Sequence, residues 1–251
     1  MLKKKVDIIL PVYNSKKYIL DTIHSIIKQT YKHWNLIIID DCSSDGTYEI
    51  LKKIKKKFIY SNKIFLYRNT KNKGQAFARN FGLKKSKSTF VAFIDSDDLW
   101  DKNKLDKQIQ FMLYNKYSFT YTDYISIKNN KKKIITVPNN YNYKNFLKNT
   151  SIATSTMIIK KSIINNIFFP QLRLCEDFYF KCKVLKKTMA YKYSGVYSYY
   201  KLRNNSLQSN RIKVLLAVWN VNKNLNKINF FDNLILMFFI SFNSLKKYGF
   251  R

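Results

Sequence analysis

Short apolar runs alternate with stretches of helical periodicity through the first half of the chain. Four runs have the length of strands, at residues 6–12, 36–40, 64–67 and 90–95. Between and after them, apolar residues recur every three or four positions, which predicts helices near 19–27, 50–58, 74–83 and 105–113. Ser15 is the expected N-cap of the first helix, and Gly74 is the expected start of the third. Strands that alternate with helices are typical of a mostly parallel sheet flanked by helices, so we predict an α/β fold.

The pattern changes after about residue 117. The alternating segment "SFTYTDYISI", a lysine-rich turn and the short segment "IITV" predict an antiparallel hairpin. A strand at 154–160, a helix from about Cys175 and a tyrosine-rich strand at 191–201 are expected to follow. We therefore expect three parts: residues 1–125 with the mostly parallel sheet, a smaller mixed region at 126–210, and a helical C-terminal segment at 211–251.

The chain is strongly basic. Its 251 residues include 47 Lys and Arg against 15 Asp and Glu, which is a formal net charge of +32. Such a charge is typical of proteins that bind nucleic acid or an anionic membrane. An AT-rich genome would also enrich Lys, Asn and Ile, whatever the function. We expect no nucleic-acid partner, because the aromatic side chains fall mainly at positions of apolar periodicity, where core packing explains them.

Cysteine content and two apolar stretches bear on the compartment. Three cysteines without a CxxC pair argue for a reducing compartment and against a zinc module. Pro11 and Asn14 interrupt the apolar run after the basic start, so no secretory signal is expected and the protein is expected to be cytoplasmic. The stretch "NLILMFFISF" at 233–242 is too short to cross a bilayer, which takes about 20 residues. It fits either a core helix or an interfacial helix in contact with the anionic inner face of the cell membrane.

Polar residues collect where the predicted parallel strands end. The first strand ends in "PVYN" (11–14), the second in "DDCSSDGT" (40–47) and the fourth in "DSDD" (95–98). In an open parallel sheet, ligands bind outside the carboxyl ends of the strands. Each cluster taken alone is also explained as a turn or as the cap of the next helix, as for Asp97 and Asp98. The two explanations stay open at this point.

Asp95 and Asp97 fit the cap explanation least well. A D-x-D pair at a strand end brings two carboxylates together, which costs several kcal/mol unless a cation lies between them. Oxygen ligands suit Mg²⁺ or Mn²⁺, and these ions keep coordination positions open for substrate phosphates. We predict that this pair is half of a metal site whose other ligands come from a diphosphate. No GxxxxGK[ST] or GxGxxG motif is present, which argues against a P-loop nucleotidase and a dinucleotide-dependent oxidoreductase.

A sugar nucleotidyltransferase is an alternative that also uses carboxylates and a metal at a sheet edge. Such an enzyme needs to hold a triphosphate near the first strand, usually with glycine and basic residues. The loop in question reads "PVYNSKKY" and contains no glycine. A basic nucleic-acid-binding protein is the other alternative, and the positions of the aromatic side chains argue against it, as stated above.

The motifs occur in an order that resembles the family 2 glycosyltransferases, which have the Rossmann-like GT-A fold. The segments that carry the resemblance are "VDIILPVYN", "IIIDDCSSDGT", "NKGQAFARNFGL" and "FVAFIDSDDLW", and further along "CEDFYFK" and "YYKLRNNSLQ". The resemblance implies inverting, metal-dependent transfer of a hexosyl or N-acetylhexosaminyl group. The implied donor is a nucleotide sugar, usually a UDP-sugar. The implied acceptor is a glycan or lipid-linked glycan in cell-surface polysaccharide or lipopolysaccharide synthesis.

The resemblance also implies a role for particular residues. The implied nucleotide-sugar site consists of Pro11, Val12, Tyr13, Asn14, Asp40, Asp41, Arg79, Asp95, Ser96 and Arg203. Asp95 and Asp97 match the D-x-D that binds Mn²⁺ or Mg²⁺ together with the diphosphate. Glu176 and Asp177 match the family's ED pair. Asp177 is the expected base, because an inverting transfer needs a carboxylate that takes the proton of the attacking acceptor hydroxyl.

One segment departs from the family pattern. In "YKLRNNSLQ" (200–208), Lys201 stands where many relatives have Arg, Arg203 stands for His, and Gln208 stands for Ser. Lysine cannot make the bidentate phosphate contact of arginine, so Arg203 is the expected diphosphate contact here. The residues that select sugar and acceptor are expected around 151–156 and 173–176.

Overall fold

The computed structural model describes residues 4–57, 61–129, 131–201 and 210–248. Its helices are α1 (Ile19–Ile27), α2 (Thr47–Lys57), α3 (Gln75–Lys85), α4 (Lys104–Tyr114), α5 (Tyr143–Lys148), α6 (Glu176–Leu185), α7 (Arg211–Asn220) and α8 (Phe230–Tyr248). Its strands are β1 (Val6–Val12), β2 (Trp34–Asp40), β3 (Ile64–Arg68), β4 (Phe90–Phe93), β5 (Leu99–Trp100), β6 (Phe119–Lys128), β7 (Lys131–Ile135), β8 (Asn140–Tyr141), β9 (Ile158–Lys160) and β10 (Ala190–Lys201).

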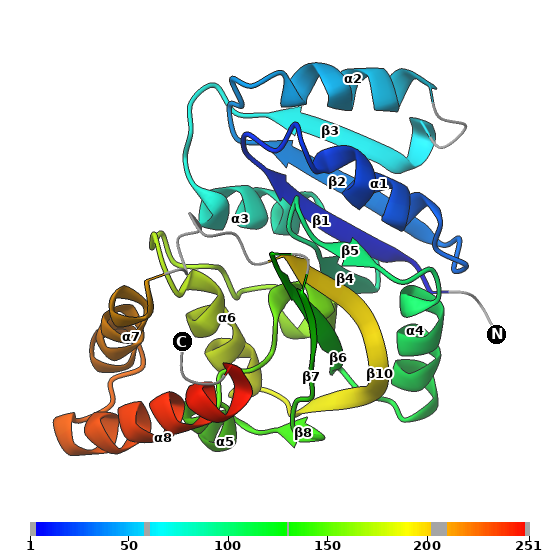
Figure 1. Cartoon of the computed structure of the whole chain (residues 1–251). Helices are drawn as coiled ribbons and strands as arrows, with labels where there is room; N and C mark the ends of the chain where they lie inside the picture. Colours follow the sequence, from blue (N-terminus) through cyan, green and yellow to red (C-terminus); the bar gives the residue numbers. More distant parts are fainter. Residues whose placement is uncertain (1–3, 58–60, 130, 202–209, 249–251) are drawn as a thin grey trace.

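The strands form one continuous sheet (Figure 1). Its order is β3-β2-β1-β4-β9-β6-β10-β5, with β7 paired to β6 and β8 paired to β10. The first four strands of this order are parallel to one another, and β9 runs antiparallel to both β4 and β6. The structure therefore confirms the mostly parallel α/β fold, the mixed second region and the antiparallel hairpin, which is β6 with β7.

Helices cover both faces of the sheet, and each face has its own apolar core. On β1, which is buried along its whole length, Ile8 and Leu10 belong to the core under α1, α2 and α4. Ile9 points to the opposite core, which α3, α5, α6 and α8 complete. A strand buried on both faces reads as a continuous apolar run rather than an alternating one, which is why "VDIILPV" was recognisable in the sequence.

Helix α3 lies unusually close to the sheet. A Cβ on Gly82 would stand 2.6 Å from Ile9 Cγ2 and 3.1 Å from Ile39 Cδ1, so only glycine fits at this contact without a shift of the strands. Gly74 is the N-cap of α3 with φ 86°, a left-handed value that glycine adopts easily, and this agrees with the predicted start of the helix. The close approach fixes the position of the α3 residues that reach the carboxyl end of β4.

Three sequence predictions about element ends were wrong. Tyr18, not Ser15, is the N-cap of α1, because the Ser15 hydroxyl is hydrogen-bonded to the Tyr13 carbonyl and the Ser96 hydroxyl instead. The fourth strand ends at Phe93, two residues before Asp95. Of the expected strand at 154–160, only Ile158–Lys160 is a strand of the sheet, since Thr154–Thr156 forms a 3-10 turn.

The C-terminal segment is helical, as predicted. Helix α7 continues into a π-helical turn, Val221–Leu225, and α8 then packs against α5 at the lower edge of the molecule (Figure 1). Within the described ranges, no helix combines the length and the apolar character needed to cross a membrane.

Candidate active site

The D-x-D segment lies just past the carboxyl end of β4, at the edge of the sheet where β1 and β2 also end. The backbone N–H of Asp95 donates to Ser155 Oγ over 3.1 Å, which anchors the segment to the 3-10 turn before β9. The hydroxyls of Ser96 and Ser15 are 2.6 Å apart, which joins the segment to the loop after β1. Helix α4 has Asn103 as its N-cap, so Asp97 and Asp98 do not cap it. The cap explanation for these two residues was therefore wrong.

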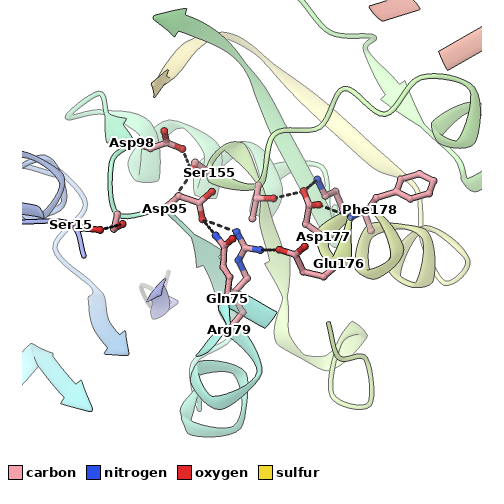
Figure 2. Close-up of polar contacts among 12 residues, drawn as sticks. Ser15, Gln75, Arg79, Asp95, Asp98, Ser155, Glu176, Asp177 and Phe178 are labelled. Carbon is pink, nitrogen blue, oxygen red and sulfur yellow. Dashed lines mark hydrogen bonds and ion pairs between the residues drawn. The ribbon is translucent and has the colours of Figure 1, made fainter. Parts of the chain in front are cut away.

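Arg79 joins the two acidic motifs. Its side chain is only 3 % exposed, and its guanidinium bonds Asp95 Oδ1 at 2.7 Å and Glu176 Oε1 at 2.8 Å (Figure 2). Gln75, one turn earlier on α3, donates to the same Asp95 oxygen over 3.0 Å. Burial lowers the pKa of Arg79, but the carboxylates of Asp95 and Glu176 more than offset this, so its pKa lies above the usual value. The buried guanidinium of Arg79 thus holds the D-x-D and ED motifs close to each other.

Asp177 lies in the first turn of α6, and hydrogen bonds fix both of its oxygens. Thr154 Oγ1 and Lys181 Nζ donate to Oδ2 over 2.9 and 2.7 Å, and the N–H of Phe178 donates to Oδ1 over 2.9 Å (Figure 2). Burial raises the pKa of Asp177, but the positive charges of Lys181 and Arg79 together lower it by more, so the net shift is downward. Its side chain keeps 22 % of its surface exposed. Asp177 is therefore an oriented, ionised carboxylate that remains accessible.

The pKa of Glu176 is shifted upward, in contrast to that of Asp177. Its side chain is 9 % exposed, and burial raises its pKa above the usual range although Arg79 acts against the shift. The neighbouring negative charge of Asp177 adds to the rise. Glu176 and Asp177 therefore differ in proton affinity. Asp177 pairs with Lys181 of its own helix, whereas the side chain of Glu176 is less exposed. Carboxyl groups whose pKa values are shifted in opposite directions are common in sites where they have separate chemical roles.

Asp98 is structural in this arrangement. It is 1 % exposed, accepts a short hydrogen bond from the hydroxyl of Ser155, and accepts from the N–H of Lys201 on β10. Burial and the charges of Asp95 and Asp97 raise its pKa well above the usual value. Of the acidic cluster, only Asp95 and Asp97 are thus partly exposed carboxylates. Their oxygen donors suit Mg²⁺ or Mn²⁺, while the described residues contain no group of three or more His, Cys, Asp or Glu side chains arranged to hold a metal.

The loop after β1 and the loop after β2 are tied together. Asn14 accepts from the N–H of Ser44 through its side chain and donates from its own N–H to Ser43 Oγ. Pro11 and Val12 end the buried β1, whereas Tyr13 is 49 % exposed at the tip. Tyr13 and Asn14 are thus the exposed members of the "PVYN" segment, and Tyr13 presents the larger apolar surface to a ligand.

Asp40 and Asp41 differ in their partners. Asp41 accepts from the N–H groups of Lys73 and Gly74 and from Asn69 Nδ2, so it holds the segment that leads into α3. Asp40 pairs through Oδ2 with Arg68 at 3.3 Å, and its Oδ1 is a buried oxygen with no partner within the described residues. The structure thus brings the predicted residues of β1, β2, β4, α3 and α6 to one edge, while Arg203 lies outside the described residues.

A pocket lies beside Asp177. Its lining comes from Gln75, Arg79, Asp95, Tyr124, Thr150, Ser151, Ile152, Ala153, Thr154, Glu176, Asp177, Lys181, Tyr200 and Lys247. The sequence had pointed to the stretch 151–156 but not to Lys181 or Lys247. The spacing of Asp177 and Lys181, four residues apart on a helix, was the signal that could have identified Lys181. Lys247 carried no such signal, because only the packing of α8 brings it to the pocket.

The fold and this pair of acidic motifs define a GT-A-type glycosyltransferase. The family model described as Glycosyl transferase family 2 matches residues 7–168. The chain therefore belongs to glycosyltransferase family 2, which confirms the resemblance seen in the sequence.

Two bacterial glycosyltransferases are similar to this chain over most of its length. The chain is 36 % identical over 232 residues, 91 % of each chain, to a putative teichuronic acid biosynthesis glycosyltransferase, TuaG, of Bacillus subtilis. It is 38 % identical over 221 residues, 86 % of this chain and 84 % of the relative, to WfgD of Escherichia coli. WfgD is described as a UDP-Glc:alpha-D-GlcNAc-diphosphoundecaprenol beta-1,3-glucosyltransferase.

Solved structures share the fold. Staphylococcus aureus TarS 1–349 in complex with UDP-GlcNAc superposes with a TM-score of 0.72 at 23 % identity, over 96 % of this chain and 73 % of that one. The mannosyltransferase PcManGT of Pyrobaculum calidifontis, in complex with GDP-Man and Mn²⁺, superposes with a TM-score of 0.71 at 14 % identity. That match covers all of this chain and 77 % of the other.

Proposed function

We propose that this protein is an inverting glycosyltransferase of cell-surface polysaccharide or lipopolysaccharide synthesis. It moves a hexosyl or N-acetylhexosaminyl group from a nucleotide-diphosphate donor, a UDP-sugar, to a saccharide or lipid-linked saccharide. The observation that carries the proposal is the Arg79 bridge, whose two ion pairs hold the D-x-D and the ED motif beside one pocket. In this arrangement the donor diphosphate and the acceptor hydroxyl would meet between Asp95 and Asp177.

Asp177 is the proposed base. The acceptor oxygen attacks C1 of the donor sugar, the bond from C1 to the diphosphate oxygen breaks, and the hydroxyl proton passes to Asp177. Because Lys181 and Arg79 lower the pKa of Asp177, the carboxylate is ionised at neutral pH. A weak base of this kind takes the proton late, when the attacking oxygen has become acidic in the transition state. Thr154 and Lys181 also fix the orientation of the carboxylate, which favours a productive geometry.

The nucleotide would lie along the edge formed by β2, β1 and β4. Tyr13 is exposed for stacking on the base, and Asp40 and Asp41 are next to this loop. Asp41 is 3 % exposed and accepts several hydrogen bonds, and Asp40 is fully buried, so we assign both carboxylates to the support of the uracil and ribose site. Asp95 and Asp97 would hold a Mg²⁺ or Mn²⁺ ion, which stabilises negative charge on the departing diphosphate when bound.

The identity of donor and acceptor is inferred from the relatives. WfgD, at 38 % identity, is described as using UDP-Glc and a diphosphoundecaprenol-linked acceptor. A lipid-linked acceptor lies in a membrane, and we propose that the enzyme reaches it as a peripheral protein at the cytoplasmic face of the cell membrane. Family membership also favours sugar transfer over the two alternatives raised from the sequence, a sugar nucleotidyltransferase and a nucleic-acid-binding protein.

Calorimetric titration of UDP into the full chain tests the donor site. We expect heat of binding in the presence of Mn²⁺, and we expect it to be lost with a chelator and in Asp97→Ala. Asp106→Ala, an acidic residue of α4 hydrogen-bonded to Gln110, serves as the matched control and should bind like the wild type.

Each outcome bears on a different part of the proposal. Binding of GDP or dTDP in place of UDP would overturn the UDP assignment but leave the site intact. Binding of UDP that is unchanged in Asp97→Ala and with the chelator would overturn the metal role of the D-x-D.

A further inference from the structure

Helix α8 exposes apolar side chains on the face that points away from the protein. Five of these residues recur three or four positions apart, or side by side, along the helix and form what we call the α8 outer face: Phe231, Leu234, Ile235, Phe238 and Phe242. Their exposed fractions lie between 47 % for Leu234 and 76 % for Phe231. The opposite side of the helix packs on the core through Leu236 and Ile240. The helix is therefore apolar on both sides.

This pattern is not that of a helix on a water-exposed surface. A surface helix usually has one apolar stripe toward the core and polar residues toward solvent. A contiguous exposed apolar patch on a folded protein marks a site of interaction with a protein or a membrane. The neighbouring helix α7 adds exposed apolar residues, Ile212 at 70 % and Leu216 at 57 %, and Trp219 of α7 contacts Phe230 with ring centroids 5.5 Å apart.

Charge indicates which partner fits. Residues 211–248 contain six basic residues and one acidic residue: Arg211, Lys213, Lys223, Lys227, Lys246, Lys247 and Asp232. Asp232 is engaged with Asn229 at the start of α8. A second copy of a chain with net charge +32 would meet this basic surface with like charge. An anionic bilayer offers opposite charge at its phosphates and an apolar layer beneath them.

We propose that the α8 outer face docks the protein on an anionic lipid bilayer. The helix lies in the plane of the membrane, with its apolar side chains at the boundary of headgroups and acyl chains and the neighbouring lysines on lipid phosphates. The partner is recognised by its chemistry, which is a negatively charged lipid surface with accessible hydrocarbon.

The same helix reaches the catalytic pocket. Lys247, in the last turn of α8, lines the pocket that contains Asp177. Asn243, one turn earlier, donates to the carbonyl of Lys148, and this bond helps to fix α8 on α5. A 19-residue helix is about 28 Å long, so docking through α8 keeps the pocket within that distance of the bilayer. A lipid-linked diphosphate acceptor could then reach Asp177 without leaving the membrane, and this last consequence rests on the proposed function.

Flotation with lipid vesicles tests the docking. The full chain is mixed with phosphatidylcholine vesicles, with or without phosphatidylglycerol, and protein that floats with the lipid is measured. We expect the wild type to float with the anionic vesicles and less so at high salt. The double variant Phe238→Gln, Phe242→Gln removes two side chains that are 68 % and 57 % exposed and should lower the partition coefficient by about tenfold or more.

A matched control removes exposed aromatic rings elsewhere. The double variant Phe65→Gln, Tyr114→Gln changes residues of β3 and α4 that are 40 % and 88 % exposed, and it should float like the wild type. Circular dichroism and the thermal midpoint report on folding of both variants. UDP calorimetry on the α8 variant separates the two proposals, because loss of flotation with normal UDP binding concerns docking alone.

Three results would overturn the proposal. The first is a wild type that does not float with anionic vesicles. The second is an α8 variant that floats as well as the wild type, which would assign any binding to the basic surface alone. The third is a wild type that dimerises in sedimentation experiments while the α8 variant is a monomer, which would make a second copy of the chain the occupant.

Discussion

The pairing of Lys181 with Asp177 makes a quantitative prediction. Lys181 Nζ is 2.7 Å from Asp177 Oδ2, also donates to the carbonyl of Ile152 over 2.7 Å, and has a side chain only 4 % exposed. Lys181→Met keeps the length and apolar volume of the side chain but removes its charge and its hydrogen bonds. In the variant, Asp177 keeps its hydrogen bonds from Thr154 and from the N–H of Phe178, and the more distant charge of Arg79.

The magnitude follows from the burial of the pair. Breaking a buried ion pair by removing one partner typically costs about 3–5 kcal/mol. Since the Asp177 side chain is 22 % exposed and part of its charge stays hydrated, we expect a loss near the lower end, about 3 kcal/mol at pH 7. An opposite charge at this distance lowers a carboxyl pKa by about 1–3 units, so the pKa of Asp177 should rise by that amount in the variant.

The sign of the pH dependence is fixed by the direction of the shift. The pKa of Asp177 is lowered in the folded wild type, so its contribution to stability is fully present above the pKa of the unfolded chain, near 3.9. That contribution is lost as the pH falls from there through the lower folded-state pKa. The difference in stability between wild type and Lys181→Met should therefore be largest at neutral pH and should shrink below about pH 4.

Urea unfolding at a series of pH values from neutral to acid measures this difference. The other carboxyl groups are the same in both proteins and largely cancel in it. Lys183→Met, which removes an exposed lysine of the same helix, is the control and should be close to the wild type at every pH. A free energy of unfolding for Lys181→Met that equals the wild type at neutral pH, or a difference that does not change with pH, would refute the pairing argument.

Three further predictions concern the acidic motifs and the packing beneath them. Asp177→Asn should reduce sugar transfer by about 10²–10⁴-fold, whereas Glu176→Gln should retain more activity, and a single-turnover assay that finds the reverse order would move the base to Glu176. Arg79→Met leaves the carboxylate of Glu176 buried without its partner and should lower the free energy of unfolding by about 3–5 kcal/mol, as measured in urea. Gly82→Ala places a Cβ 2.6 Å from Ile9 Cγ2 and should cost about 1–3 kcal/mol despite the better helix propensity of alanine, and a thermal midpoint at or above the wild type would contradict this.

The apolar pattern was a reliable guide to the elements and to the class of fold. The run at 6–12 coincides with β1, and the helical periodicities correspond to α1, α2, α3 and α4. These features are local, because the spacing of apolar side chains along the chain reflects the face that each element buries. Element ends were less well determined. The Ser15 hydroxyl finds a partner in Ser96, 81 residues away, and no local pattern reports such a bond.

The composition of the site was likewise visible in the sequence, but the partners of its residues were not. The D-x-D and the ED pair were recognisable as motifs, and the family they indicated is the family of this chain. Arg79 was expected at the nucleotide, yet its guanidinium joins Asp95 and Glu176, residues 16 and 97 positions away. Asp41 was expected in the nucleotide-sugar site, and the sequence did not show that its carboxylate accepts from the N–H groups of Lys73 and Gly74 before α3.

The sequence by itself determined the alternation of strands and helices, the acidic motifs and the positive charge, since these follow from the order of side chains along the chain. Only the tertiary structure decided which charges meet, which carboxyl group gains or loses protons more easily, and which side of α8 stays exposed. The physical reason is that hydrogen bonds, ion pairs and burial depend on distances between residues far apart in sequence, and those distances are set by the packing of helices on the sheet.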